Sequence, residues 1–263
     1  MQYVDSRKRF QERVVIVTGA GNGIGRGAAI AFAQEGATVY GVDLDPRGLE
    51  ATQQCIRHGG GEFVGLPADV AEPATAARSV EQILQRSGRA DVLVNNAGIN
   101  MAKRIGVLEV ADWDKVFATN LRSAYLFSKA VWPTFQRQNA GVILNIASIM
   151  GQVGGVGAPA YCATKSGILM LSRCLAKDGA PHGIRVNAVC PGYIDTPIMD
   201  RALQAMPDPQ SARRELVGRM PLGRMGTPDD IAAALLFLAS AEAGYISGAE
   251  LTIDGAVTAT QID

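Results

Sequence analysis

The chain has 263 residues, 48% of them hydrophobic and 19% charged, so it is long and apolar enough to bury a large core. Its 25 basic and 25 acidic residues balance, which disfavours a nucleic-acid-binding or membrane-surface protein. The start of the chain lacks the apolar segment of a signal peptide, and no apolar run approaches the roughly 18 residues of a membrane span. The four cysteines and two histidines form no metal-ligand cluster, so we expect a cytoplasmic protein without a metal site.

Short apolar runs alternate with helical patterns along the chain. The run 13–18 is mostly apolar, which is typical of a strand buried on both faces of a parallel sheet. The alternation predicts right-handed β-α-β units in a single α/β domain over 1–263, with a solvated N-terminal arm at 1–12. Strands are predicted at 13–18, 38–42, 62–66, 91–94, 142–146, 185–190 and 250–254. Helices are predicted before Gly36, at 46–58, at 72–87, at 112–138 with Pro133 as a candidate break, around Tyr161, and at 229–239 with Thr227 as N-cap.

A glycine-rich turn joins the first predicted strand to the first helix. Gly19, Gly23 and Gly25 follow the spacing Gly-x-x-x-Gly-x-Gly, and Gly21 is an additional glycine. Glycine lets the backbone approach a pyrophosphate closely, and the following helix offers free N–H groups and the positive end of its dipole. In this context the turn predicts a dinucleotide site in preference to a tight turn without a ligand.

Asp43 ends the second predicted strand, where a carboxylate can accept hydrogen bonds from the adenosine ribose hydroxyls. The same charge would repel the 2′-phosphate of NADP. No basic residue follows Asp43 directly, and Asn22 rather than a basic residue stands in the glycine turn. We therefore predict NAD as the cofactor, with NADP as the less favoured alternative because Arg47 is near. Asp45 before Pro46 suits the duty of helix N-cap better than Asp43 does.

Ser148, Tyr161 and Lys165 form the candidate reaction centre. Tyr161 and Lys165 are four residues apart on one helix face, and Ser148 ends the fifth predicted strand. A nearby lysine favours the phenolate, which a phenol with an ordinary pKa near ~10 needs in order to act as a base. The Tyr-x-x-x-Lys spacing alone is weak evidence, since a buried tyrosine and a solvated lysine match it too. Asp69 and Asn96 also fall at predicted strand ends, the edge where parallel sheets bind ligands.

The segment 193–227 follows the sixth predicted strand, and prolines divide it into short helical pieces. A long, interrupted segment after a site-bearing strand indicates a substrate lid, and a surface excursion without a role is the alternative. The candidate substrate-pocket residues are Asn100, Met150, Gln152, Val153, Gly154, Ala158, Tyr193 and the lid from Ile198.

Taken together, the motifs resemble those of the short-chain dehydrogenases/reductases over nearly the full chain. Each motif is short, but their order and separations are specific. The resemblance implies a Rossmann-type, doubly wound parallel sheet of seven strands in the order 3-2-1-4-5-6-7, and a homotetramer. The motifs are Thr18-Gly19-x-x-x-Gly23-Ile24-Gly25, Asp69-Val70, Asn95-Asn96-Ala97-Gly98, Asn120, Ser148, Tyr161-x-x-x-Lys165, Pro191-Gly192 with Thr196, and Ser247-Gly248 to Asp254-Gly255.

The resemblance also implies a role for each site residue. Tyr161 would be the general acid/base, Lys165 would lower its pKa and hold the nicotinamide ribose, and Ser148 would hydrogen-bond the reacting oxygen. Asn120 would hold a water that links Lys165 to solvent. Further cofactor contacts are implied for Gly19, Asn22, Gly23, Ile24, Gly25, Asp43, Asp69, Val70, Asn96, Ala97, Gly98, Pro191, Gly192, Ile194 and Thr196.

These observations predict an NAD-dependent oxidoreductase that interconverts a secondary alcohol and a ketone, or a cyclic hemiacetal and a lactone. A polyol or sugar is the leading substrate class. The alternative is a reductase of 3-oxoacyl thioesters on acyl-carrier protein, which is acidic and could meet a basic lid. A dinucleotide sensor without catalysis is disfavoured because serine, tyrosine and lysine are all present. The lid arginines are Arg201, Arg213, Arg214, Arg219 and Arg224.

Overall fold

The computed structural model describes residues 8–259 and builds them around one sheet of seven strands. The strand order is β3-β2-β1-β4-β5-β6-β7, and each neighbouring pair runs parallel. This confirms the doubly wound, Rossmann-type sheet that the resemblance implies. The strands are β1 (Val14–Thr18), β2 (Thr38–Asp43), β3 (Glu62–Pro67), β4 (Val92–Asn95), β5 (Gly141–Ile146), β6 (Ile184–Pro191) and β7 (Glu250–Ile253).

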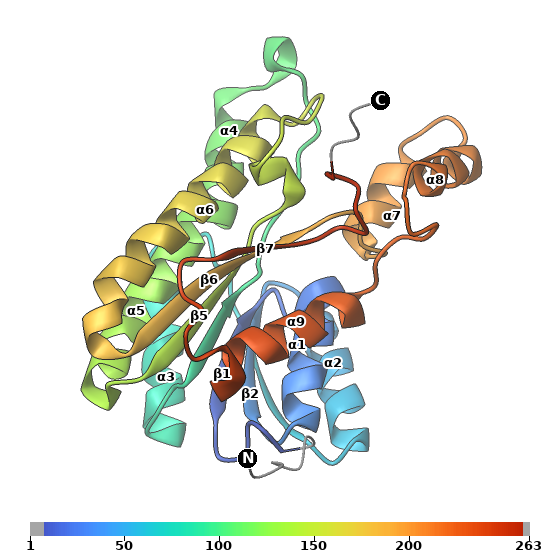
Figure 1. Cartoon of the computed structure of the whole chain (residues 1–263). Helices are drawn as coiled ribbons and strands as arrows, with labels where there is room; N and C mark the ends of the chain where they lie inside the picture. Colours follow the sequence, from blue (N-terminus) through green and yellow to red (C-terminus); the bar gives the residue numbers. More distant parts are fainter. Residues whose placement is uncertain (1–7, 260–263) are drawn as a thin grey trace.

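Helices connect the strands and cover both faces of the sheet. They are α1 (Gly23–Gln34), α2 (Pro46–His58), α3 (Thr75–Ser87), α4 (Val110–Phe117), α5 (Ser123–Gln138), α6 (Pro159–Gly179), α7 (Pro197–Gln204), α8 (Pro209–Gly218) and α9 (Pro228–Ala239). Figure 1 shows α1, α2 and α9 on one side of the sheet and α3, α5 and α6 on the other. Within residues 8–259, no helix combines the length and apolarity needed to span a bilayer.

The central strand β1 is buried on both faces, as its apolar sequence predicts. Val15 and Val17 belong to the core cluster under α1 and α9, and Val14 and Ile16 belong to the cluster under α3 and α5. Successive side chains of a strand point to opposite faces, so a strand between two helical layers is apolar along its length unless its polar side chains find partners. In β1 the side chains are apolar up to its carboxyl end, where the polar Thr18 and the glycine turn of the site follow.

The region 112–138 differs from the single helix predicted there. A π-helical turn, Ala118–Arg122, joins α4 to α5 and contains the buried Asn120. Pro133 does not break α5, which continues to Gln138. Val131 and Phe135, on either side of the proline, are fully buried. Packing of these side chains compensates for the backbone hydrogen bond that proline lacks.

The expected N-terminal arm is packed on the fold where the structure describes it, at residues 8–12. Phe10 is buried, and its ring centroid lies 4.9 Å from that of Phe32 in α1. Arg9 pairs with Glu35 at 2.8 Å. Phe10 and Arg9 thus anchor this end of the arm to the fold, while Lys8, Gln11 and Glu12 are exposed as expected; residues 1–7 lie outside the described part.

The predicted lid segment leaves the sheet after β6 and returns at α9. Its helices α7 and α8 stand beyond the strand ends (Figure 1). The two ends of the segment pair with each other, since the Gly226 amide donates to the Tyr193 carbonyl and the Asp195 amide donates to the Gly226 carbonyl, both at 2.9 Å. The segment 193–227 is thus an excursion whose two ends are hydrogen-bonded to each other, and its role as a lid stays a prediction.

Candidate active site

Two adjoining cavities lie at the carboxyl edge of the sheet. The larger, about 420 Å³, is lined by residues that follow β1, β2, β3 and β4, and we call it the cofactor cavity. The smaller, about 160 Å³, is lined by residues that follow β4, β5 and β6, and we call it the reaction cavity. Ile24, Asn96 and Ile198 are among the residues that line both, so the two cavities are continuous.

The glycine turn after β1 is packed too tightly for other side chains. A Cβ atom on Gly25 would overlap the Gly19 carbonyl oxygen. Asn96 holds the turn from the next strand, because its Nδ2 atom donates to the carbonyls of Thr18 (3.0 Å) and Gly19 (3.1 Å). The first turn of α1 is thereby brought against the cavity with its N–H groups exposed, an arrangement that fits a pyrophosphate.

Asp43 lies in the wall of the cofactor cavity. Its carboxylate accepts the backbone N–H of Gly21 at 2.8 Å and of Asp45 at 2.9 Å. A Cβ atom on Gly21 would lie 2.9 Å from Oδ2 of Asp43, which explains the additional glycine. Asp45 caps α2 by accepting the N–H of Arg47, as predicted. Asp43 therefore has a fixed orientation and keeps acceptor capacity for ribose hydroxyls.

Arg26, in the first turn of α1, is a basic residue near the turn that sequence reasoning missed. Its guanidinium donates to Thr52 Oγ1 (3.1 Å), to the Gly48 carbonyl (3.4 Å) and to the Gly21 carbonyl. Arg26 therefore ties the glycine turn to α2, and neither it nor Arg47 lines the cofactor cavity.

The structure brings together most of the predicted cofactor residues. Gly25 lines neither cavity. Its missing side chain allows α1 to pack against the Gly19 carbonyl. The cofactor cavity is lined by Gly19, Asn22, Gly23, Ile24, Asp43, Asp69, Val70, Asn96, Ala97, Gly98 and Thr196. The reaction cavity is lined by Ser148, Tyr161, Lys165, Pro191, Gly192 and Ile194, among others. This donor set and shape fit a nicotinamide dinucleotide.

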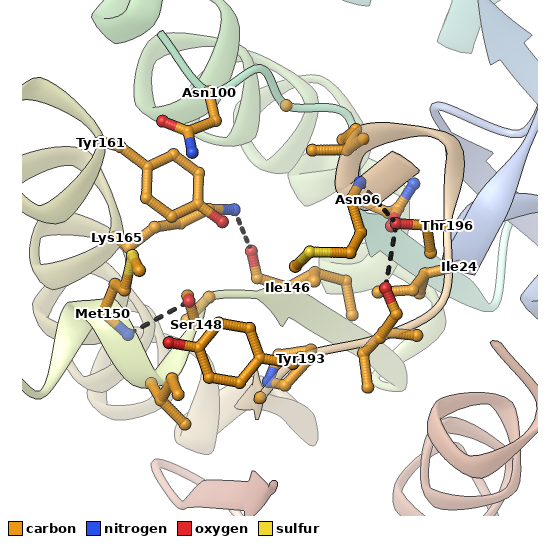
Figure 2. Close-up of a pocket in the computed structure, with 18 of the residues that line it drawn as sticks. Ile24, Asn96, Asn100, Ile146, Ser148, Met150, Tyr161, Lys165, Tyr193 and Thr196 are labelled. Atoms are coloured by element: carbon orange, nitrogen blue, oxygen red, sulfur yellow. Dashed lines mark hydrogen bonds between the residues drawn. The ribbon is translucent and has the colours of Figure 1, made fainter. Parts of the chain in front are cut away.

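Ser148, Tyr161 and Lys165 converge on the reaction cavity (Figure 2). Tyr161 and Lys165 are one turn apart on α6, and Ser148 begins the short 3₁₀ turn that follows β5. The Ser148 Oγ atom accepts the Met150 N–H at 3.1 Å, which leaves its own proton available for donation. Lys165 Nζ lies 5.5 Å from the centroid of the Tyr161 ring and donates to the Ile146 carbonyl at 2.7 Å.

Burial dominates the electrostatics of this centre. It raises the pKa of the Tyr161 phenol, and the Ser148 hydroxyl acts in the opposite direction. Burial also lowers the pKa of Lys165 to about 8. The resemblance implies that Lys165 lowers the pKa of Tyr161, but in this arrangement the ammonium is directed to the Ile146 carbonyl and burial has the larger effect.

Asn120 lies behind the reaction centre and lines neither cavity. Its side chain accepts the Ile99 N–H (2.8 Å) and donates to the Ile99 carbonyl (2.9 Å) and to Thr164 Oγ1 (3.2 Å). A Cβ atom on Gly98 would lie 3.3 Å from Asn120 Oδ1 and 3.7 Å from Lys165 Nζ. Asn120 and Lys165 thus approach the same point, and the water expected between them stays a prediction.

The substrate wall agrees in part with the predicted set. Asn100, Met150, Tyr193 and Ile198 line the reaction cavity. Gln152, Val153, Gly154 and Ala158 do not line it. The chain turns outward at 152–154, where Gln152 accepts a hydrogen bond from Thr252 at 3.2 Å and Val153 is 52% exposed, whereas Ala158 is buried at the start of α6. Met199, which belongs to the predicted lid from Ile198, lines the cavity too. Sequence reasoning missed Ile99, Ile146 and Ile149, whose apolar side chains also line it. No motif marks these three residues, and only their proximity in sequence to Asn100 and Ser148 could have suggested them.

Two basic residues of the cofactor cavity were also missed as cofactor contacts. Lys115 reaches the cavity from α4 and Arg201 reaches it from α7. Neither belongs to a motif. Among the residues that the structure describes, no cluster of His, Cys, Asp and Glu could hold a metal ion.

Comparisons with known proteins agree with this geometry. The family model described as Enoyl-(Acyl carrier protein) reductase matches residues 19–258. Cyclopentanol dehydrogenase of Comamonas sp. is 41% identical over 252 residues, which cover 95% of this chain and 99% of that protein. The 3-oxoacyl-(acyl-carrier-protein) reductase FabG of Thermotoga maritima is 37% identical over 254 residues, covering 94% and 98%. The crystal structure of levodione reductase superimposes with a TM-score of 0.93 at 34% identity, covering 96% and 100%.

Proposed function

This chain belongs to the short-chain dehydrogenase/reductase family, and from that premise we propose that it transfers hydride between NAD(H) and a secondary alcohol or ketone. The observation that carries the proposal is the convergence of Ser148, Tyr161 and Lys165 on a cavity that is continuous with the cavity at the glycine turn. When bound, a nicotinamide ring supplies the acceptor or donor of the hydride.

The residues of the reaction cavity divide the remaining chemistry among them. The Tyr161 hydroxyl takes the proton of the alcohol during oxidation and returns it to the ketone during reduction. Ser148 donates a hydrogen bond to the same oxygen, which stabilises negative charge there. Lys165 holds the nicotinamide ribose and passes the proton on toward Asn120. Because burial raises the pKa of Tyr161, oxidation is favoured at alkaline pH.

Asp43 supports NAD over NADP as the cofactor. Its carboxylate is fixed in the wall of the cofactor cavity by two backbone N–H groups. A 2′-phosphate there would face a negative charge, and the nearby Arg26 and Arg47 do not line the cavity to offset it. The remaining cofactor contacts follow the cavity lining described above.

The lining of the reaction cavity supports a compact, largely apolar substrate. Beyond the reaction centre, its wall includes the apolar side chains of Met150, Met199, Ile149 and Ile198, and Asn100 and Tyr193 add polar groups. A polyol carries more hydroxyl groups than these few polar side chains can bond, and those buried against the apolar part of the wall would cost affinity. The polyol or sugar expectation is therefore less well supported than a simple or cyclic secondary alcohol, of the kind named for the Comamonas relative.

Reduction of a 3-oxoacyl thioester is the second candidate, because the Thermotoga relative bears that name. The lid argues against it, since three of its five arginines are already paired with acidic residues. These pairs are Arg213 with Asp195 and Asp200, Arg219 with Glu215, and Arg224 with Asp230.

The test is an assay of nicotinamide absorbance with NAD and NADP in parallel, at alkaline pH, against cyclic alcohols, aliphatic secondary alcohols, polyols and sugars. We expect reduction of NAD by cyclic or aliphatic alcohols, and loss of turnover in Tyr161→Phe. Oxidation of NAD(P)H by a 3-oxoacyl thioester alone would favour the second candidate. Tyr161→Phe with wild-type turnover would contradict the mechanism, and NADP bound more tightly than NAD would contradict the role of Asp43.

The family also supports proposals about the protein as a whole. We propose that it forms a homotetramer and works in the cytoplasm on a free small molecule. The lid, residues 193–227, is proposed to close over the substrate.

A further inference from the structure

One arginine of the lid lines the cofactor cavity rather than the outer surface. Arg201 lies on α7, and among residues 8–259 the other cationic side chain that lines this cavity is Lys115, on α4. Arg213, Arg219 and Arg224 are paired with acidic side chains of the lid and α9. Arg201 is therefore the one lid arginine placed to meet a ligand of the cofactor cavity.

The Arg201 guanidinium is available for such a ligand. Its side chain is exposed, and within the described residues no ion pair or side-chain hydrogen bond involves it. Arg214 on α8 is exposed and uncommitted in the same way, but it lies against an open surface groove formed by α8 alone. The two arginines thus differ in location and not in burial or pairing, which makes Arg214 a matched control.

Packing places Arg201 above the glycine turn. The lid helix α7 begins against this turn, because a Cβ atom on Gly23 would lie 3.3 Å from Thr196 Cγ2. Thr196 caps α7, and Ile198 and Arg201, three residues apart, share the helix face that lines the cofactor cavity. Arg201 therefore extends over the cavity about one helical turn beyond the contact with the glycine turn.

Within the described part of the chain, the residues at the strand ends that line the cofactor cavity include no cation that could pair with a pyrophosphate. Asp43 and Asp69 are its acidic lining residues; Asp43 ends β2 and Asp69 follows β3, at the proposed adenosine end. The glycine turn supplies backbone N–H groups, but the nearby Arg26 is directed to α2. A pyrophosphate is doubly negative, and a guanidinium is the side chain best shaped to bind it.

We propose that Arg201 binds the pyrophosphate of the dinucleotide and thereby holds the lid over the cofactor cavity. This inference rests on the proposed function, because it requires a dinucleotide as ligand. By linkage, a contact that favours the closed lid when the dinucleotide is bound makes the order of α7 and α8 depend on the cofactor, before any substrate enters.

The test compares the wild type with Arg201→Gln and Arg214→Gln by fluorescence titration with NADH, NADPH and ADP-ribose. ADP-ribose carries the pyrophosphate without the nicotinamide, so both NADH and ADP-ribose should bind Arg201→Gln about tenfold more weakly, the size of one charge-assisted hydrogen bond. Arg214→Gln should bind both as the wild type does. Arg201→Lys, which keeps the charge, should recover part of the affinity.

Hydrogen exchange supplies a readout that a merely structural role would not move. At saturating NADH, amides of 197–218 should be protected in the wild type and less protected in Arg201→Gln, with equal exchange in the absence of ligand. Wild-type affinity and lid protection in Arg201→Gln would overturn the inference and leave the proposed function intact. A loss confined to NADPH would place Arg201 at a 2′-phosphate and overturn it too. A wild type that binds no nicotinamide dinucleotide would overturn the proposed function and this inference together.

Discussion

Lys165 is a cationic side chain that the fold removes from water. It is 3% exposed, and its Nζ atom donates to the Ile146 carbonyl. Burial penalises the charged form, so the pKa of the lysine falls to about 8. The unfolded chain therefore binds more protons than the folded chain between about pH 8 and the ordinary lysine value of 10.5. The free energy of unfolding should rise with pH across this window as the burial cost is relieved.

Replacing Lys165 by Met should remove this pH dependence. Between about pH 7 and about pH 9.5, the lysine alone should add about 2 kcal/mol to the free energy of unfolding of the wild type. Urea unfolding at the two pH values measures the increment. Lys165→Met should show an increment smaller by about that amount, whereas the control Lys177→Met, at an exposed position of the same helix, should keep it. Equal increments in the wild type and Lys165→Met would show that the lysine is not desolvated as the structure indicates.

At the scale of single residues, the sequence predicted relations that are local along the chain. The spacing of Tyr161 and Lys165 placed them on one helix face, and the other motifs of the chain indicated that this face meets Ser148. The direction of Arg26 and Arg201 depends on helices packed from elsewhere in the chain, and no spacing encodes it. The same reason explains why Gln152, close to Ser148 in sequence, points away from the cavity.

The start of α9 shows how a single element is fixed by its own residues. Thr227 Oγ1 accepts the Asp230 N–H at 3.3 Å, and Asp230 Oδ2 accepts the Thr227 N–H at 2.7 Å, forming a capping box. Arg224 holds the same carboxylate with two hydrogen bonds, at 2.7 and 3.0 Å. The sequence predicted this cap because threonine before proline at a helix start is a local signal.

Removal of the Thr227 hydroxyl should cost about 1 kcal/mol of stability. Thr227→Ala leaves the Asp230 N–H without its side-chain acceptor, so chemical denaturation should show that loss. Thr227→Ser keeps the hydroxyl and should unfold close to the wild type. If the alanine and serine variants were equally stable, the cap would not contribute as the hydrogen bonds indicate.

Element boundaries were less predictable where tertiary packing overrides local preference. Pro133 is a local breaker, yet α5 continues because Val131 and Phe135 are anchored in the core. The π-helical turn at Asn120 also has no local signature, since it lets the side chain reach Ile99 and Thr164 on other segments.

For the whole molecule, the alternation of strands and helices predicted a parallel sheet but not the order of its strands. That order depends on which side each crossover passes, and it came from the family resemblance. The segment 193–227 was likewise predicted only in part. Its prolines marked a change of pattern, but the hydrogen bond between Gly226 and Tyr193 joins residues far apart in sequence, and no local pattern encodes it.

A groove between the α4–α5 region and α6 bears on the proposed homotetramer. It is lined by Phe117, Leu121, Tyr125, Gly167 and Leu171, among others, and the Tyr125 side chain is 45% exposed there. The apolar and aromatic side chains of this groove, between α5 and α6, are suited to pack against a second copy of the same chain.

Introducing a charge into this groove should disrupt the assembly without unfolding the subunit. Tyr125→Glu would place an unpaired carboxylate in the contact between copies, and burial of such a charge is strongly unfavourable. Light scattering should give a mass near four times 27.7 kDa for the wild type and a smaller assembly for Tyr125→Glu. Met206→Glu, which changes a comparably exposed residue between α7 and α8, should keep the tetramer. A Tyr125→Glu tetramer as stable to dilution as the wild type would mean that this groove faces solvent, and the copies would then have to meet through other surfaces.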